Sequence, residues 1–217
     1  QDAYHGDTFG AMSVSGRSIF TKAFSNLLFH VDFIPFPEKG DAESIIALEE
    51  LLRSGDIAAL IVEPLVQGTA GMRMYSSATL ERYFQLCKQY DTLIIADEVM
   101  TGFGRTGSLF ACDTTQTKPD IICLSKGITG GTMPFGVTAT TLEIFNAFYD
   151  DDKLKTLYHG HSYTANPVAC AAALASLDLT LDESCEENRK RIADSYDAFS
   201  DKIRQNNAVA DIRQTGT

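Results

Sequence analysis

The segment Leu93-Ile94-Ile95-Ala96-Asp97-Glu98 sets four apolar residues in a row directly before two acidic ones. The runs Ile57–Val62 and Asp120–Leu124 have the same apolar character, and each also stops at charged or polar residues. Between Ile57–Val62 and Leu93–Ala96, the segment Ser77–Tyr90 carries apolar residues at intervals of three to four, which is typical of one helix face. Continuous apolar strands that alternate with helices indicate a sheet with helices on both faces, so the pattern predicts a largely parallel α/β fold.

The same alternation continues toward the end of the chain. The expected elements are a strand over Gly136–Thr140, helices over Leu142–Tyr149, Asn166–Leu181 and Glu183–Gln205, and a strand over Ala208–Ile212. Pro167 stands where the first turn of a helix tolerates proline. We place a boundary near Leu181 and expect residues 1–181 to be part of a large domain and residues 182–217 to begin a small α/β domain.

The composition is that of a soluble globular protein. Of the 217 residues, 44% are hydrophobic and 22% are charged, which argues against disorder. The net charge of −11 argues against a nucleic-acid partner, because duplex binding requires Lys and Arg to neutralise phosphates. No apolar run approaches the ~18 residues that a membrane span needs, and no signal-peptide pattern opens the chain. We therefore expect no membrane partner.

The cysteines bear on the cellular compartment. They are an odd number without a Cys-x-x-Cys pair, and they stand at Cys87, Cys112, Cys123, Cys170 and Cys185. This usage favours buried thiols in a reducing, cytoplasmic environment over a disulfide framework or a zinc site. Because the chain begins Gln1-Asp2-Ala3 without an initiator Met, we also expect it to be a piece of a longer protein.

Ionisable residues stand at the carboxyl ends of three predicted strands, where ligands bind in open parallel sheets. They are Glu63, Asp97-Glu98 and Lys126. A lysine directly after a buried strand is costly unless it is paired or chemically used, and a desolvated lysine is suited to forming a Schiff base. Enzymes that use pyridoxal phosphate need such a lysine and an acid for the pyridinium nitrogen, and Asp97 lies 29 residues before Lys126. Taken singly, the acid could be a turn residue and the lysine a solvated loop residue.

The Gly-rich segment Thr101–Gly107 could hold a phosphate. It lacks the G-x-G-x-x-G order and the Gly-Lys-Ser/Thr ending of a P-loop. A nucleotide-binding α/β module therefore stays open as an alternative, although it leaves Lys126 and Asp97 unexplained.

The combined motifs resemble those of the class III pyridoxal phosphate aminotransferases. The resemblance is carried by Ile95-Ala96-Asp97-Glu98-Val99, Thr101–Gly107 and Leu124-Ser125-Lys126-Gly127, and by Tyr4-His5-Gly6, Val62-Glu63-Pro64, Gly130-Gly131 and Thr164–Pro167. It is dense from Tyr4 to about Leu181. Four stretches are most similar to one particular member of the class: Tyr4–Ser13, Gly71–Tyr75, Gly130–Pro134 and Tyr158–Tyr163. The resemblance implies fold type I, a mostly parallel sheet between helices.

The resemblance also implies roles around the cofactor. Lys126 would bind pyridoxal 5'-phosphate as a Schiff base and then act as the general base of the reaction. Asp97 would pair with the pyridinium nitrogen. Tyr4 would stack near the ring and contact substrate, His5 would frame the ring, and Glu63 would lie near the cofactor.

Further residues would act on substrate by the same resemblance. Asp7 could help to select a substrate amine. Arg105 could be a structural anion partner in the Gly-rich loop, which we favour, or a contact for a substrate carboxylate. Gly160, His161 and Ser162 match a stretch that reaches from the neighbouring subunit toward substrate and phosphate. The resemblance therefore implies a homodimer with its active site at the subunit interface, acting on a small amine donor and a keto acceptor.

Two parts of the family's site are expected outside this sequence. A Gly-Ser turn for the phosphate would precede Tyr4, and an Arg for a substrate carboxylate would follow Thr217. We therefore expect these 217 residues alone to hold cofactor weakly and not to transaminate. Within the class, an enzyme of the acetylornithine or 4-aminobutyrate type is the competing interpretation, and a non-catalytic scaffold with the same fold is a further one.

Overall fold

The computed structural model describes residues 1–38 and 40–217 of the chain. The described residues divide into two compact units. Unit 1 consists of Gln1–Asp97 and Cys112–Pro119, and unit 2 of Glu98–Ala111 and Asp120–Thr217. The boundary expected near Leu181 falls inside unit 2, between two consecutive helices, and stays a prediction.

Two parallel strands form the centre of unit 1. Strand β1 (Ala59–Val62) pairs with β4 (Leu93–Asp97), and Val62 lies opposite Ala96. Continuing this register by one residue sets Glu63 beside Asp97. Both carboxylates therefore emerge at the same edge of the strand pair, as the sequence pattern predicts for a parallel arrangement.

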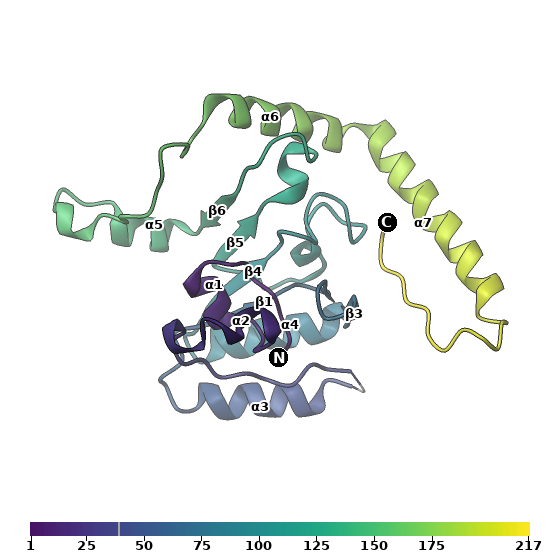
Figure 1. The fold of residues 1–217 in the computed structure, drawn as a ribbon, viewed down its shortest axis with the longest axis horizontal. Helices are drawn as coiled ribbons and strands as arrows, with labels where there is room; N and C mark the ends of the chain where they lie inside the picture. The colour runs from purple at the N-terminus through teal and green to yellow at the C-terminus, as the bar shows by residue number, and fades with distance from the viewer. Residues whose placement is uncertain (39) are drawn as a thin grey trace. The chain divides into compact units, whose positions relative to one another are not determined.

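Helix α4 (Ser77–Gln89) contributes several buried residues to the core of unit 1 and confirms the predicted helix. The side chain of Ser76 accepts a hydrogen bond from the amide of Thr79 and so caps its first turn. The fully buried residues of this helix are Leu80, Phe84, Leu86 and Cys87. Burying each large apolar side chain stabilises the fold by roughly 1.5–3 kcal/mol. Figure 1 shows α4 and α3 (Ala42–Leu52) side by side along the strands.

Short elements complete unit 1. They are α1 (Phe9–Val14), α2 (Ile19–Lys22), η1 (Ser25–Leu27) and an antiparallel hairpin of β2 (Val66–Gln67) and β3 (Arg73–Met74), while η2 (Ala111–Thr114) begins at the last residue of a unit 2 segment. The sequence analysis predicts none of them and also omits α3. Most are too short to show a hydrophobic period, because periodicity needs a window of about 11 residues.

Unit 2 contains the antiparallel pair β5 (Ile121–Leu124) and β6 (Val137–Thr140), with Ile121 opposite Thr140. The turn η3 (Lys126–Thr129) follows β5 almost directly, and α5 (Leu142–Phe148) and η4 (Lys153–Lys155) follow β6. The strands confirm the predicted positions and the mixed α/β class. The residues of β1 and β5 are half-buried, and β6 is mostly exposed.

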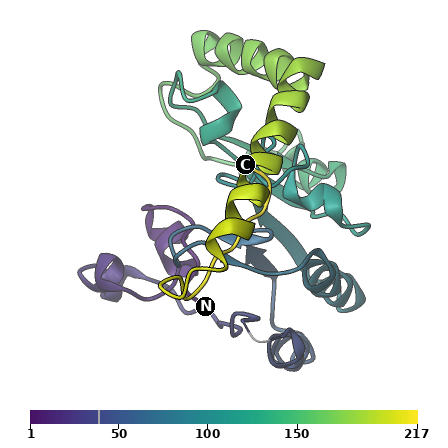
Figure 2. The same ribbon diagram turned by 90° about the vertical axis from the view of Figure 1, so that its right-hand side faces the viewer.

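Helices α6 (Pro167–Leu181) and α7 (Glu183–Ile203) confirm the two long helices predicted near the end of the chain. The side chain of Asn166 accepts hydrogen bonds from the first amides of α6, and Pro167 occupies the first turn. Asp182 ends α6, and its carboxylate accepts from the amide of Ser184 at the start of α7. The chain changes direction sharply at this one residue (Figure 2).

The strand predicted over Ala208–Ile212 is wrong. This segment has irregular backbone, and the amide of Val209 donates to the carbonyl of Asn206 within a turn. An apolar run becomes a strand only when another backbone pairs with it. In the described part of the chain no strand pairs with this segment.

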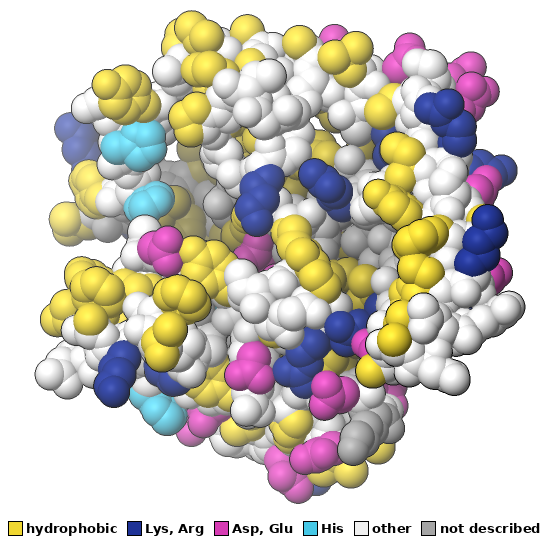
Figure 3. Space-filling view, turned by 45° about the vertical axis from the view of Figure 1, so that its right-hand side comes forward, with side chains coloured by type: hydrophobic (Ala, Val, Ile, Leu, Met, Phe, Trp, Pro, Cys, Tyr) yellow, Lys and Arg dark blue, Asp and Glu magenta, His cyan; other side chains and the backbone are white. Residues whose placement is uncertain are grey.

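Large hydrophobic side chains of unit 2 reach the surface. Ala169 is the only buried residue described on α6, whereas Val168, Leu174 and Leu179 are exposed. On the face drawn in Figure 3, hydrophobic side chains lie in the open beside charged ones. Within residues 1–38 and 40–217, no helix combines the length and apolar character needed to cross a bilayer.

Candidate active site in unit 1 and the lysine turn in unit 2

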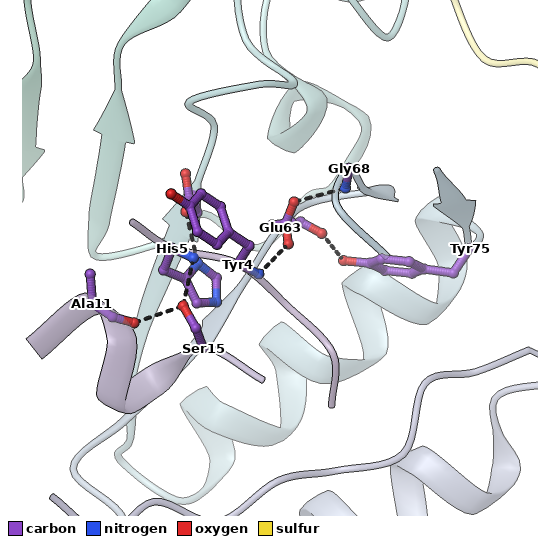
Figure 4. A network of polar contacts seen from close by, with 8 residues as sticks. Tyr4, His5, Ala11, Ser15, Glu63, Gly68 and Tyr75 are labelled. Atoms are coloured by element: carbon purple, nitrogen blue, oxygen red, sulfur yellow. Dashed lines mark hydrogen bonds and ion pairs between the residues drawn. The ribbon is translucent and has the colours of Figure 1, made fainter. Parts of the chain in front are cut away.

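The carboxyl ends of β1 and β4 carry two buried acids. Glu63 follows β1 and Asp97 ends β4, and their exposed fractions are 7% and 6%. The irregular segment that contains Tyr4 and His5 runs past both of them (Figure 4). The structure thus brings together four of the residues that the sequence analysis singles out.

His5 and Asp97 form a close pair. Nδ1 of His5 lies 2.7 Å from Oδ2 of Asp97. An ionised carboxylate only accepts hydrogen bonds, so Nδ1 carries the proton and donates it. The ring is held in place because the amide of His5 donates to Oγ of Ser15, which in turn donates to the carbonyl of Ala11. The far nitrogen of His5, Nε2, is buried and has no hydrogen-bond partner among the described residues.

Glu63 binds two main-chain amides. Its Oε1 accepts from the amide of Tyr4 at 3.0 Å, and its Oε2 accepts from the amide of Gly68 at 2.9 Å. The hydroxyl of Tyr75 donates to the carbonyl oxygen of Glu63 at 2.8 Å. Burial raises the pKa of the Glu63 carboxyl, partly offset by the hydrogen bonds from the two amides.

Tyr4 presents its ring at the surface of unit 1, with 38% of the residue exposed. A hydrogen bond with Asp7 raises the pKa of the Tyr4 hydroxyl, and burial adds to the effect. Asp7 therefore reaches the same hydroxyl that the resemblance assigns to substrate contact. A fifth predicted residue joins the cluster in this way.

A cavity of about 450 Å³ adjoins this cluster within unit 1. It runs along β1 and under the segment 29–37, and His5, Glu63 and Tyr75 contribute to its wall. The apolar residues of β1 and of that segment form much of the rest.

Lys126 belongs to unit 2 and opens the turn η3 directly beyond β5. Its φ of 34° lies in the left-handed region, which is costly for a residue with a side chain. Lys126 is exposed, because β5 is only half-buried and the turn that follows it stands at the surface of unit 2. Its predicted role at the cofactor stays a prediction.

Close contacts fix the backbone next to Lys126. A Cβ on Gly127 would lie 2.9 Å from Cδ2 of Phe103, which no real side chain tolerates without movement. The carbonyl of Gly127 accepts a hydrogen bond from Oγ of Ser176 on α6 at 3.4 Å. Before the turn, Oγ of Ser125 donates to the carbonyl of Phe135 at 2.6 Å. The lysine turn is therefore held by three parts of unit 2: the Gly-rich loop, helix α6 and the segment that leads into β6.

The sequence analysis misses the part played by Glu98. This fully buried carboxylate accepts from the hydroxyl of Thr101 at 2.7 Å and from the amide of Ala111 at 3.0 Å. It thereby ties both ends of the Gly-rich loop together. The signal in the sequence is a threonine three residues after an acid, which is too common to be noticed alone. Arg105 is exposed, and its carbonyl accepts from the amide of Thr217.

Gly160, His161 and Ser162 form an exposed turn of unit 2 ahead of α6. The amide of His161 donates to Oγ1 of Thr164 at 2.9 Å, and Nδ1 of His161 accepts from the amide of Tyr163 at 3.1 Å. The turn is thus stabilised by its own residues. Its predicted contribution to a partner's site stays a prediction.

In the described part of the chain, the cysteines and acidic residues lie apart from one another as far as metal binding is concerned. Through residues 1–38 and 40–217, His, Cys, Asp and Glu nowhere gather in a group of three or more that could hold a metal ion. Among the described residues the five cysteines form no disulfide; Cys87 and Cys112 are buried and the other three are partly exposed.

Known proteins share both the sequence and the fold of this chain. The family model described as aminotransferase class-III matches residues 1–217. Over 83% of the chain, the sequence is 53% identical to the adenosylmethionine-8-amino-7-oxononanoate aminotransferase of Synechococcus elongatus. The protein of the same name from Anoxybacillus flavithermus is 41% identical over 99% of the chain.

Solved structures agree with these matches. The adenosylmethionine-8-amino-7-oxononanoate aminotransferase of Methanocaldococcus jannaschii matches the whole chain with a TM-score of 0.91 and 38% identity. The ornithine aminotransferase of Toxoplasma gondii, described with pyridoxal phosphate at partial occupancy, matches 99% of the chain with a TM-score of 0.84 and 28% identity. The chain spans about half the length of the curated relatives it matches, from 45% to 50% in these four cases.

Proposed function

The chain belongs to the class-III aminotransferases, and from that premise we propose that the intact protein transfers an amino group to 8-amino-7-oxononanoate, giving 7,8-diaminononanoate for biotin biosynthesis. The relatives named for this acceptor support the proposal, the first of them at 53% identity. The amino donor is a small amine, and S-adenosylmethionine, which the relatives' name contains, is the first one to test.

The residues present fit the cofactor of this family, pyridoxal phosphate. The donor set offers a primary amine at Lys126 for an aldehyde and a buried carboxylate at Asp97 for a protonated ring nitrogen. His5 keeps the carboxylate oriented, and its buried Nε2 is a polar atom without a hydrogen-bond partner among the described residues. When bound, the cofactor supplies a ring that accepts electrons from the substrate carbon.

The remaining chemistry is proton transfer and positioning by the chain. Lys126 Nζ would carry the proton between the substrate carbon and the cofactor. Asp97 would keep the ring nitrogen protonated because its negative charge favours a positive neighbour. Tyr4 would cover the ring and meet the substrate, with Asp7 hydrogen-bonded to its hydroxyl. The buried His5–Asp97 pair at the end of β4 is the observation that carries the proposal.

We further propose that the intact protein is a cytoplasmic homodimer. The exposed turn at Gly160, His161 and Ser162 supports this arrangement, because the stretch would serve the site of a second subunit. Mass measurement of the intact protein in solution tests it. A monomeric mass at working concentration would contradict the dimer.

Replacing Lys126 tests the assignment of the reaction. In the intact protein, borohydride reduction followed by peptide mapping should attach the cofactor to the peptide that contains Lys126. The Lys126→Ala variant should lose the visible absorption band of covalently bound cofactor and lose aminotransfer. Lys118→Ala is the matched control, because that lysine binds carbonyl oxygens of Cys112 and Thr115 in a loop. A normal band in Lys126→Ala would contradict the proposal.

A panel of acceptors separates this activity from its alternatives. We expect turnover with 8-amino-7-oxononanoate and little with substrates of the acetylornithine or 4-aminobutyrate type. A preference for either of those substrates would identify another ω-aminotransferase. Saturable nucleotide binding without any aminotransfer would instead favour the nucleotide-binding module.

A further inference from the structure

Both carboxylate oxygens of Glu63 accept hydrogen bonds from main-chain amides of the protein. We propose that Glu63 is a positioning residue, which sets Tyr4 for substrate by holding the main-chain amide of Tyr4 and touches neither cofactor nor substrate itself. The inference deepens the proposed function and rests on it for the role of Tyr4.

The first argument is how the two carboxylate oxygens are used. One accepts from the amide of Tyr4 and the other from the amide of Gly68, at 3.0 and 2.9 Å. Hydrogen bonds from amides to a carboxylate are stronger than those to a neutral oxygen. With 7% of the residue exposed, Glu63 has both oxygens engaged inside the protein. The side chain of Glu63 therefore bridges two pieces of backbone. Tyr4 lies 59 residues before Glu63 in the sequence, and Gly68 lies five residues after it.

Second, few backbone hydrogen bonds hold the segment that contains Tyr4. Residues 1–8 form neither helix nor strand, so no ladder of backbone hydrogen bonds fixes them. Buried amides need partners, and here side chains supply two of them: Glu63 for Tyr4 and Ser15 for His5. The amide of Gly16 also donates to the carbonyl of Ala3 at 2.7 Å. Without Glu63, the amide of Tyr4 would lose its partner.

The third argument is the support beneath Glu63. The hydroxyl of Tyr75, next to β3, donates to the carbonyl of Glu63, and Gly68 directly follows β2. From the same hairpin, Gln67 donates to the carbonyl of Gln1 at 3.1 Å and Arg73 pairs with Asp2 at 3.2 Å. The hairpin therefore holds the segment at Gln1 and Asp2, and Glu63, which precedes the hairpin, holds it at Tyr4 (Figure 4).

This arrangement gives the stretch Gly71–Tyr75 a task. The sequence analysis notes it only as a resemblance to one member of the class. In the structure it builds β3 and supplies Arg73 and Tyr75, both of which act on the segment of Tyr4 or on Glu63.

Glu63→Gln in the intact protein tests the inference. Gln keeps the shape but has one acceptor oxygen, so either Tyr4 or Gly68 loses its partner. We expect KM for the amine substrate to rise about three- to tenfold, with a smaller change in kcat and an unchanged dissociation constant for pyridoxal phosphate. Glu81→Gln is the matched control, since Glu81 also accepts from two main-chain amides, those of Gln116 and Thr117, in a surface loop. It should leave KM unchanged.

A double-mutant cycle with Tyr4→Ala tests whether Glu63 acts through Tyr4. If it does, Glu63→Gln should change KM by less than about twofold once the Tyr4 side chain is absent. An equal rise in KM in both backgrounds would overturn the inference. A weaker dissociation constant for the cofactor in Glu63→Gln would overturn it too, because that result would make Glu63 a cofactor ligand.

Hydrogen exchange supplies a readout that does not depend on activity. Peptides that contain Tyr4 or Gly68 should exchange faster in Glu63→Gln than in the wild type, and the same peptides should be unchanged in Glu81→Gln. Unchanged exchange would overturn the inference even in an active enzyme. Wild-type protein without aminotransfer would instead contradict the proposed function and leave the exchange result to stand alone.

Discussion

At the residue scale, the two acids at neighbouring strand ends have different partners. Asp97 faces the imidazole of His5, whereas Glu63 faces two amides that carry no formal charge. The two amides compensate a buried charge on Glu63 only in part, which agrees with the raised pKa of its carboxyl.

The stability of the protein should depend on pH through Glu63. Burial raises the pKa of Glu63 in the folded state above the ordinary value of 4.5, so the folded protein binds this proton more readily than the unfolded chain. The contribution of Glu63 is thus most favourable below the ordinary pKa and is lost as pH rises through the raised one. Glu63→Gln lacks this titration. As pH rises through the raised pKa, the free energy of unfolding of Glu63→Gln should therefore increase relative to that of the wild type.

Denaturant unfolding at a series of pH values checks this expectation. Glu81→Gln should show the opposite slope: although burial acts to raise it, hydrogen bonds from Thr117 and Gln116 leave the pKa of Glu81 lowered. A difference between Glu63→Gln and wild type that stays constant with pH would contradict the prediction.

A second residue-scale prediction concerns Gly127. Its missing Cβ leaves room for the ring of Phe103, so Gly127→Ala should destabilise unit 2 by about 1–3 kcal/mol. Gly10→Ala is the control, because no atom lies within 4 Å of a Cβ there and alanine favours the helix α1. Thermal unfolding measures both. Adding Phe103→Ala should restore part of the loss in Gly127→Ala, and a variant as stable as wild type would show that the contact is absent.

Single residues also mark the limit of sequence reasoning about the site. The strand-end positions of Glu63, Asp97 and Lys126 were predictable because an apolar run ends visibly in the sequence. The contact between His5 and Asp97, 92 residues apart, follows from the path of an irregular segment that has no period to read. The exposure of Lys126 likewise depends on what covers β5, which the local sequence does not encode.

At the element scale, the long periodic helices were the ones that the sequence predicts most closely. The helices α4, α6 and α7 each span 13 residues or more and follow their predicted ranges closely. The two-residue strands of the hairpin have no pattern of their own and exist because they pair with each other. The error at Ala208–Ile212 has the same cause, since a strand is a property of two segments.

The capping of α6 should be measurable at this scale. Oδ1 of Asn166 accepts from the amides of Val168 and Ala169, so Asn166→Ala should lower the free energy of unfolding by about 1 kcal/mol. Asn166→Asp keeps the acceptor and should stay near wild type. Chemical denaturation followed by circular dichroism compares them. Equal losses in both variants would show that the cap does not stabilise the helix.

At the scale of the whole molecule, charge and exposed apolar surface act against each other. The chain carries a net charge of −11, and large hydrophobic side chains stand exposed along α5, α6 and α7. Like charge keeps copies apart at neutral pH, whereas apolar surface attracts them once that charge is lost. The two effects change balance as the acids take up protons.

We therefore expect this chain to self-associate as pH falls toward its isoelectric point of about 4.7. Light scattering at fixed protein concentration should rise in that range and fall again when pH returns to neutral. Added salt at neutral pH should also raise the light scattering, because it screens the charge. Scattering that stays flat through the isoelectric point would contradict the prediction.

The bond between Glu63 and position 4 has a consequence for how such an enzyme can change in evolution. Glu63 holds the amide of Tyr4 and leaves the ring outside the bond. Every amino acid except proline carries that N–H, so the scaffold accepts many side chains at position 4. Selection could exchange the ring, and with it the preferred substrate, in single mutational steps that leave the folded framework intact.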